Sequence, residues 1–203
     1  MNQTLAKILY VAGVTTFCTF LACWAVLAHQ ENTQSASRQT ATSRMADEEF
    51  AKKAAQGGMA EVKLGQLAEE KAQSGEVKKF GERMVEDHTK ANDQLKEVAM
   101  KENINLPSDL DPKDEAKYES LSKLSGPQFD KAYSRAMVKD HAQDIAEFRR
   151  EATNGQKPDL KRFASETLPT LQSHLRQARQ MEQAAMREGM ARSSRNSGAT
   201  QHR

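Results

Sequence analysis

Apolar residues recur at the three- and four-residue spacing of amphipathic helices along four long stretches of the chain. The stretches cover about residues 47–73, 74–103, 125–154 and 158–188. Ser74 is a suitable N-cap for the second stretch, and Asn154-Gly155 is a suitable end for the third. No stretch alternates apolar and polar residues between turn signals, as a half-buried strand would. The pattern therefore predicts an all-α domain.

The lengths of the connections predict how these helices are arranged. The first two stretches nearly adjoin, and so do the last two, so each pair should form an antiparallel hairpin. The link over residues 105–125 is long enough to return along the bundle, and Asp111-Pro112 should open a short helix within it. The middle two long helices are then parallel. We expect a four-helix bundle over residues 46–188, made of two antiparallel hairpins joined by a long crossover, with a kink at Pro169.

A Met-Val-x-Asp-His phrase occurs twice, at residues 84–88 and 137–141. His88 and His141 both fall on the apolar stripes of their helices, and His174 does so in the last helix. Counted from the two helix starts, His88 and His141 lie at one depth, ~20 Å along parallel helices that rise 1.5 Å per residue. The same counting places Glu61 and His174 at that level. The sequence thus predicts a buried polar layer of four residues, one from each long helix.

Three interpretations of this layer are open. The histidines could be neutral and bonded to one another or to Glu61, which would fix the register of the bundle. They could instead form a mononuclear site with Glu61 for one Zn, Fe or Mn ion. In that case affinity should fall below about pH 6, because imidazole ligands must be neutral. The third interpretation is acid–base catalysis on a small molecule.

Asp87 and Asp140 point about 100° away from the adjacent histidines, so they are candidate orienting groups or ion-pair partners rather than direct ligands.

The N-terminal region predicts export from the cytoplasm. Residues 8–28 carry no charge and follow Lys7. This run suits a membrane-spanning signal anchor, which would give a membrane partner, or a cleaved signal peptide, because small residues precede His29. Lipidation at Cys23 is a further alternative. In each case the domain lies in the cell envelope, in the periplasm, behind a polar tether over residues 29–45. The basic end, residues 189–203, is expected to be disordered.

Composition excludes several functions. The formal net charge of +2 gives no reason to expect a nucleic-acid partner. Both cysteines, Cys18 and Cys23, lie in the apolar segment, so the domain has neither a disulfide framework nor a thiolate nucleophile. The sequence also has no glycine-rich phosphate loop. An enzyme is therefore the less favoured expectation.

The chain resembles a bacterial family of exported proteins known as domain of unknown function 4142. The resemblance rests on Phe50, residues 58–62, both Met-Val-x-Asp-His phrases, Leu106-Pro107, residues 124–130 and residues 168–171 leading to His174. It implies a ferritin-like four-helix bundle and an exported location, without a biochemical activity. Ferritin-like di-iron sites place a glutamate three residues before each histidine. Here those positions hold Val85, Val138 and Leu171, which argues against a di-iron oxidase or an iron store.

Two functions follow as hypotheses. The favoured one is a non-catalytic interaction or stress-response module of the cell envelope, containing the buried Glu/His layer. The alternative is a ferritin-like protein that binds one metal ion. The sequence identifies no cofactor with certainty and no particular protein or small-molecule partner.

Overall fold

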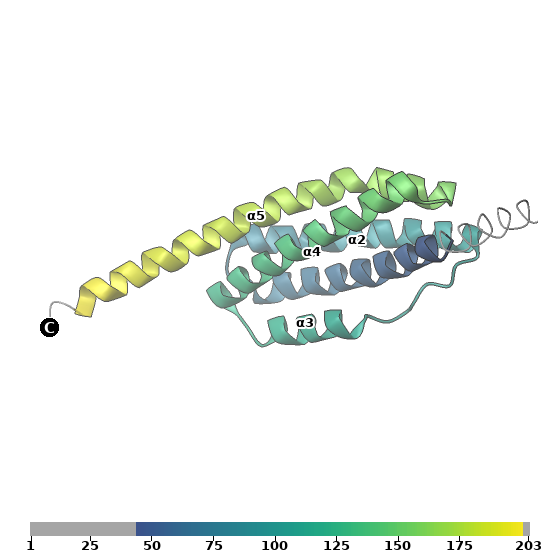
Figure 1. Cartoon of the computed structure of the whole chain (residues 1–203). Coiled ribbons are helices and arrows are strands. Elements are labelled where there is room, and N and C mark those ends of the chain that lie inside the picture. The colour runs from purple at the N-terminus through teal and green to yellow at the C-terminus, as the bar shows by residue number, and fades with distance from the viewer. Residues whose placement is uncertain (1–43, 201–203) are drawn as a thin grey trace, which may run out of the picture. The chain divides into compact units, whose positions relative to one another are not determined.

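The computed structural model of the chain describes residues 44–200, and these form a helical bundle (Figure 1). Its elements are a helix over residues 44–71, α2 (Gly75–Glu102), α3 (Pro112–Ser122), α4 (Gly126–Asn154) and α5 (Pro158–Thr200). No strand occurs within this range. The predicted all-α class, with four long helices and a short one in the crossover, is confirmed.

The helix ends follow local chemistry. Ser74 caps α2 by accepting a hydrogen bond from the backbone N–H of Glu76, and Asp111 caps α3 by accepting from Lys113 and Asp114. Asn103 ends α2 in the left-handed conformation. Gly155 ends α4 with a φ of −54°, so the left-handed cap typical of glycine is not used there. A Cβ at Gly155 would lie 2.8 Å from the Glu151 carbonyl oxygen, so close approach explains the glycine.

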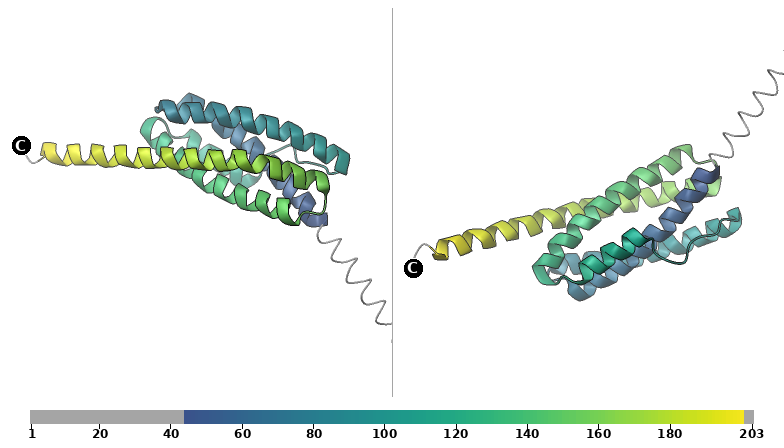
Figure 2. Two further views of the ribbon diagram at one scale, coloured as in Figure 1. Left: turned by 90° about the horizontal axis from the view of Figure 1, so that it is seen from above. Right: turned by 60° about the horizontal axis from the view of Figure 1, so that its bottom comes forward.

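The two hairpins pack with α2 and α4 parallel, as predicted (Figures 1 and 2). The start of α2 lies near the start of α4, because the N–H groups of Gln73 and Ser74 reach Asp130. The other ends also meet, because Lys157 forms an ion pair with Glu102 at 2.9 Å. In Figure 2, α3 lies along the outside of the bundle. The crossover therefore returns along the bundle and covers one of its faces.

A pair of glycines brings the helices of the first hairpin together. A Cβ on Gly65 would lie 2.6 Å from the carbonyl oxygen of Gly81, and a Cβ on Gly81 would lie 2.7 Å from that of Gly65. Any side chain at either position would push the helices apart. This contact fixes the spacing of the 44–71 helix and α2 about two turns before His88.

The hydrophobic core is divided into two clusters. One contains Leu64, Met84, Phe129, Tyr133, Met137 and Ala178, among others. The second contains Phe50, Leu95, Ile145, Phe148, Phe163 and Leu171, among others. His88, His141 and His174 lie between members of the two clusters on their own helices. The predicted polar layer therefore crosses the middle of the core.

Each hairpin loop is held by an aspartate of the opposite hairpin. Asp130 of α4 accepts from the backbone N–H groups of Gln73 and Ser74 at 3.1 and 2.9 Å. Asp47 of the 44–71 helix accepts from those of Gln156 and Lys157 at 2.9 and 2.8 Å. Both aspartates are buried. These charge-assisted bonds fix the register of the two hairpins at both ends of the bundle.

Several sequence expectations concern the ends of the chain. α5 continues through Pro169 and on to Thr200, whereas the sequence predicted a disordered tail from residue 189. No proline follows Pro169, so the backbone imposes no stop on the helix at residue 189. The expected membrane or signal segment and most of the tether lie outside the described residues. Within the described range, no helix is both long enough and apolar enough to cross a membrane.

We predict that Asp130→Asn lowers the free energy of unfolding by about 1–2 kcal/mol, because an amide cannot accept two charge-assisted bonds at once. Urea unfolding followed by circular dichroism measures the change. The control is Asp93→Asn, whose carboxylate is exposed and pairs with Lys96 on the surface of α2. This control should change stability by less than about 0.5 kcal/mol. Equal stability of the two variants would show that the Asp130 contacts do not hold the loop.

Candidate metal centre

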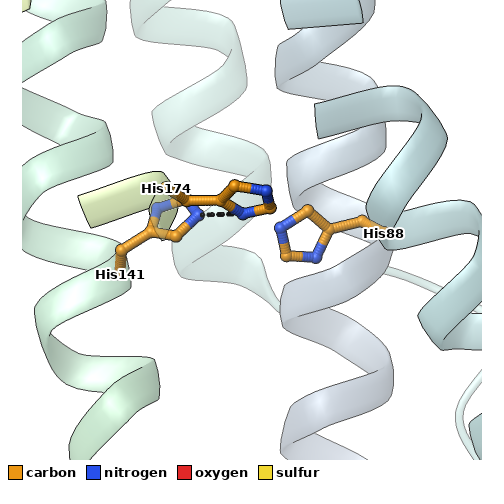
Figure 3. A group of neighbouring side chains, drawn as sticks. All are labelled: His88, His141 and His174. Atoms are coloured by element: carbon orange, nitrogen blue, oxygen red, sulfur yellow. Dashed lines mark hydrogen bonds between the residues drawn. The ribbon is translucent and has the colours of Figure 1, made fainter. Parts of the chain in front are cut away.

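Three histidines from three helices meet inside the bundle (Figure 3). His88 comes from α2, His141 from α4 and His174 from α5. One ring nitrogen from each lies within 4.8 Å of the others, and Nε2 of His141 is 3.3 Å from Nδ1 of His174. Their residue exposures are 7%, 0% and 1%. The structure therefore brings together the three histidines that the sequence placed at one depth.

The hydrogen bonds of the histidines fix where their protons lie. Nδ1 of His141 is 3.0 Å from the carbonyl oxygen of Met137, which can only accept, so Nδ1 carries the proton. Nε2 of His174 is 2.8 Å from Oδ2 of Asp87, and this nitrogen donates to the carboxylate. In neutral rings, the facing atoms Nε2 of His141 and Nδ1 of His174 then both carry lone pairs. Their contact is a hydrogen bond only if one ring takes a second proton.

Burial opposes that second proton. Burial lowers the pKa of His88 well below its usual value, and positive charge on His141 or His174 would lower it further. Burial also lowers the pKa of His141. It lowers the pKa of His174 to about 4, although the hydrogen bond to Asp87 acts in the opposite direction. At neutral pH the cluster therefore holds three neutral imidazoles.

His88 contributes a third free nitrogen. Its Nε2 is buried and has no hydrogen-bond partner among the described residues. Figure 3 shows the outer ring nitrogen of His88 turned toward the other two rings. The cluster thus presents three ring nitrogens to one small volume, and those of His141 and His174 carry lone pairs in the neutral rings. This is the donor set of a three-histidine metal site.

Glu61 is buried, as predicted, but it lies on the opposite edge of the His141 ring. Its Oε1 is 4.0 Å from Nδ1 of His141, the nitrogen that already bonds Met137. It is not part of the group of ligand atoms formed by the three histidines. In this structure Glu61 therefore does not join the three histidines as a fourth group of the cluster. Residue counts gave its level correctly but could not give the ring edge that it faces.

The two aspartates of the repeated phrase have different roles. Asp87 contacts His174, a histidine of another helix, and orients its ring. Asp140 contacts no histidine and instead forms an ion pair with Lys117 of α3 at 2.7 Å. Asp87 is thus hydrogen-bonded to a histidine, whereas Asp140 is an ion-pair partner. The repeat is therefore symmetric in sequence and asymmetric in its contacts.

The cluster is reached from the surface through a cavity of about 170 Å³. Its lining includes His88, His174, Asp87 and Glu166. The Asp87 side chain is 35% exposed, so it connects the buried His174 with solvent. A small ion could therefore reach two of the three histidines without unfolding the bundle.

Asp144 and Lys117 lie on the other side of His141. The sequence-based prediction did not include these two residues. Both line a second cavity together with Glu61 and Asp140. Asp144 follows Asp140 by one helical turn, which was a usable signal. Lys117 lies in the crossover helix, and its packing against α4 could not be inferred from periodicity.

Solved structures of low sequence identity share this fold. A fragment of domain of unknown function 305 from Deinococcus radiodurans matches with a TM-score of 0.59 and 17% identity, over 70% of this chain and 96% of its own. A Streptomyces coelicolor protein with that domain, described as secreted, matches with a TM-score of 0.57 and 16% identity, over 66% and 88%. CopM in its Cu(II)-bound form matches with a TM-score of 0.59 and 16% identity, over 68% and 96%. CopM in its Ag-bound form matches with a TM-score of 0.57 and 17% identity, over the same shares of the two chains.

At these identities the similarity concerns the fold alone. No curated protein matches the chain at a significant level. The match to a family is more extensive, because it covers residues 31–181 and includes the whole histidine cluster. The chain therefore belongs to the family described as domain of unknown function 4142.

Proposed function

We propose that this protein binds one transition-metal ion through His88, His141 and His174, and carries or sequesters that ion outside the cytoplasm. The observation that supports the proposal is the contact between His141 and His174. Two ring nitrogens face each other at 3.3 Å, while the protons of both rings are directed to Met137 and Asp87. A cation between the nitrogens turns this repulsive contact into an attractive one.

The spacing suits a metal. Two nitrogens each about 2.0–2.1 Å from one tetrahedral ion are about 3.3–3.4 Å apart. The distance between His141 and His174 has this value. His88 must move closer to complete the site, because the group as a whole spans up to 4.8 Å. Three protein ligands leave a fourth position for water or for a group that exchanges the metal.

The donor atoms favour copper and zinc. The sequence alone suggested Zn, Fe or Mn, with Glu61 as an oxygen ligand. Without that carboxylate the site has three imidazoles, which suit Cu and Zn and are less suited to the oxygen-preferring Mn. Cu(II) binds nitrogen sites more tightly than the other divalent ions of its row. The structural likeness to CopM, whose structures hold Cu(II) and Ag, is in keeping with copper as the cargo.

Exchange of the ion is favoured over a purely structural role. The surface cavity gives access to His88 and His174, and the two carboxylates in its lining, Asp87 and Glu166, outnumber its one lysine, Lys90. The uncharged segment over residues 8–28 supports a location in the cell envelope. So does the secreted description of the Streptomyces coelicolor protein. The other candidate function is a non-catalytic interaction or stress-response module, and it stays a hypothesis. The described residues identify no particular partner for it.

We predict that about one equivalent of Cu(II) or Zn(II) raises the melting temperature of the full-length wild type, because the ion binds only the folded site. His88→Ala should remove this response. The control is Leu95→Ala, which leaves a cavity in the same helix and the same core but keeps all three imidazoles. It should lower the melting temperature and retain the response. If His88→Ala responds to the ion as the wild type does, the proposed site is wrong.

The repeated phrase offers a matched pair of variants for the orienting group. Asp87→Asn should weaken metal binding by about 10–100-fold, because Asp87 holds His174 in the tautomer that frees Nδ1. Asp140→Asn occupies the corresponding position of the second phrase and should leave the affinity unchanged, because Asp140 pairs with Lys117. Isothermal titration with the same ion measures both. Equal losses in the two variants would contradict the assigned role of Asp87.

The metal should be retained to lower pH than in an ordinary histidine site. A free imidazole takes up a proton near pH 6.5 and then cannot bind metal. The pKa of folded His174 is lowered to about 4, so proton competition begins as the pH falls toward 4. This replaces the loss near pH 6 expected from the sequence. Elemental analysis after desalting at stepwise lower pH should show bound metal at pH 5, where an unstructured histidine-rich peptide has released it. Half-release near pH 6.5 would contradict the prediction.

A further inference from the structure

A second cavity, of about 230 Å³, lies between the 44–71 helix, α3 and α4. It is on the side of His141 that faces Glu61, and one of its lining residues, Asp144, also lines a smaller cavity beside His88. Its lining contains six carboxyl groups and three lysines. The carboxyl groups belong to Glu61, Asp111, Asp114, Asp140, Asp144 and Glu147. The cavity is thus acidic, because its carboxyl groups outnumber its lysines.

Most of these carboxyl groups have partners. Lys117 bridges Asp114 and Asp140, at 2.9 and 2.7 Å from its Nζ. Asp111 accepts from the first N–H groups of α3, and Glu147 accepts from the side chain of Gln143 at 3.3 Å. These contacts account for four of the six groups. They leave Glu61 and Asp144 as the two carboxyl groups of the cavity that form no ion pair with a lysine among the described residues, although the charge of Lys117 acts on Glu61.

Glu61 carries the strongest signal. The residue is 3% exposed, and its buried Oε2 has no hydrogen-bond partner among the described residues. A buried carboxyl oxygen without a partner is unfavourable by about 1–3 kcal/mol. Burial raises the pKa of Glu61 to about 8, and the charge of Asp140 adds to this effect. Burial likewise raises the pKa of Asp144 to about 7, with a contribution from Glu61. A positive charge in the cavity that both groups line would supply the partner that Oε2 of Glu61 lacks.

We propose that this cavity is a second cation site, in which Glu61 and Asp144 bind a hard divalent ion that prefers oxygen ligands. The ring of His141 does not compete for the ion, because its Nδ1 donates to Met137. Two carboxylates with water in the remaining positions are a usual ligand set for Mg²⁺ and chemically similar ions. Lys117 forms ion pairs with Asp114 and Asp140. Glu61 and Asp144 are therefore the two protein ligands of the proposed site.

The two sites differ in chemistry and share no ligand. The three-histidine cluster offers nitrogen atoms alone, whereas the second cavity offers carboxylate and amide oxygens. Softer ions should therefore occupy the first and harder ions the second. The inference does not depend on the proposed function, since Glu61 and Asp144 can bind a cation whether or not the histidines do.

Mn²⁺ is a suitable probe, because its free and bound forms are distinguished by electron paramagnetic resonance. The full-length wild type at pH 8 should bind one Mn²⁺ at concentrations up to about 1 mM, the weak end for exchangeable cation sites. Glu61→Gln and Asp144→Asn should each weaken this binding about tenfold or more, since each removes one of two charged ligands. The control Glu70→Gln removes the same charge from an exposed position on the same helix and should have no effect.

His88→Ala separates this proposal from the proposed function. It should abolish Cu(II) binding and leave Mn²⁺ binding unchanged. The proposal is overturned if the wild type binds no Mn²⁺ under these conditions, or if Glu61→Gln and Asp144→Asn bind it as well as Glu70→Gln does. It is also overturned if Mn²⁺ binding disappears in His88→Ala, which would place the ion at the histidines. Circular dichroism checks the fold, and the partly exposed Asp144 provides a test if Glu61→Gln does not fold.

Discussion

Removal of three imidazoles from water is the constraint on which the rest of this bundle depends. A buried polar group is unfavourable unless it is paired, and a half-paired network is worse than an apolar core. His141 and His174 find partners for their protons in Met137 and Asp87, but their other nitrogens face each other. The apolar clusters on either side hold the rings in this arrangement. The fold thus maintains lone pairs that a metal ion would satisfy.

Precise register is needed for such a site, and the ends of the bundle provide it. Asp130 and Asp47 each hold the loop of the opposite hairpin, so that the hairpins cannot slide past each other without breaking four charge-assisted bonds. The contact between Gly65 and Gly81 sets the distance within the first hairpin. A shift of one turn along any helix would move its histidine by about 5.4 Å and destroy the cluster.

The two sides of His141 have different electrostatic characters. One edge of its ring faces His174 and a neutral nitrogen-rich cluster, and the other faces Glu61 and a carboxylate-rich cavity. The hydrogen bond to Met137 fixes the ring between the two. Because burial lowers the pKa of the histidine and raises the pKa of the carboxyl group, both are uncharged near neutral pH without a bound ion.

Local patterns in the chain are enough to predict the four long helices, most of their ends, the two hairpins and the level of the polar layer. These follow from local periodicity and loop length, which depend on neighbours along the chain. Three contacts depend on the packed bundle: Glu61 lies at the Nδ1 edge of His141, Asp87 contacts His174, and Asp140 pairs with Lys117. The angle of each helix about its own axis sets these contacts. That angle results from the packing of the whole bundle. Periodicity predicts which face of a helix is buried, but not which atoms of its side chains contact a neighbouring helix.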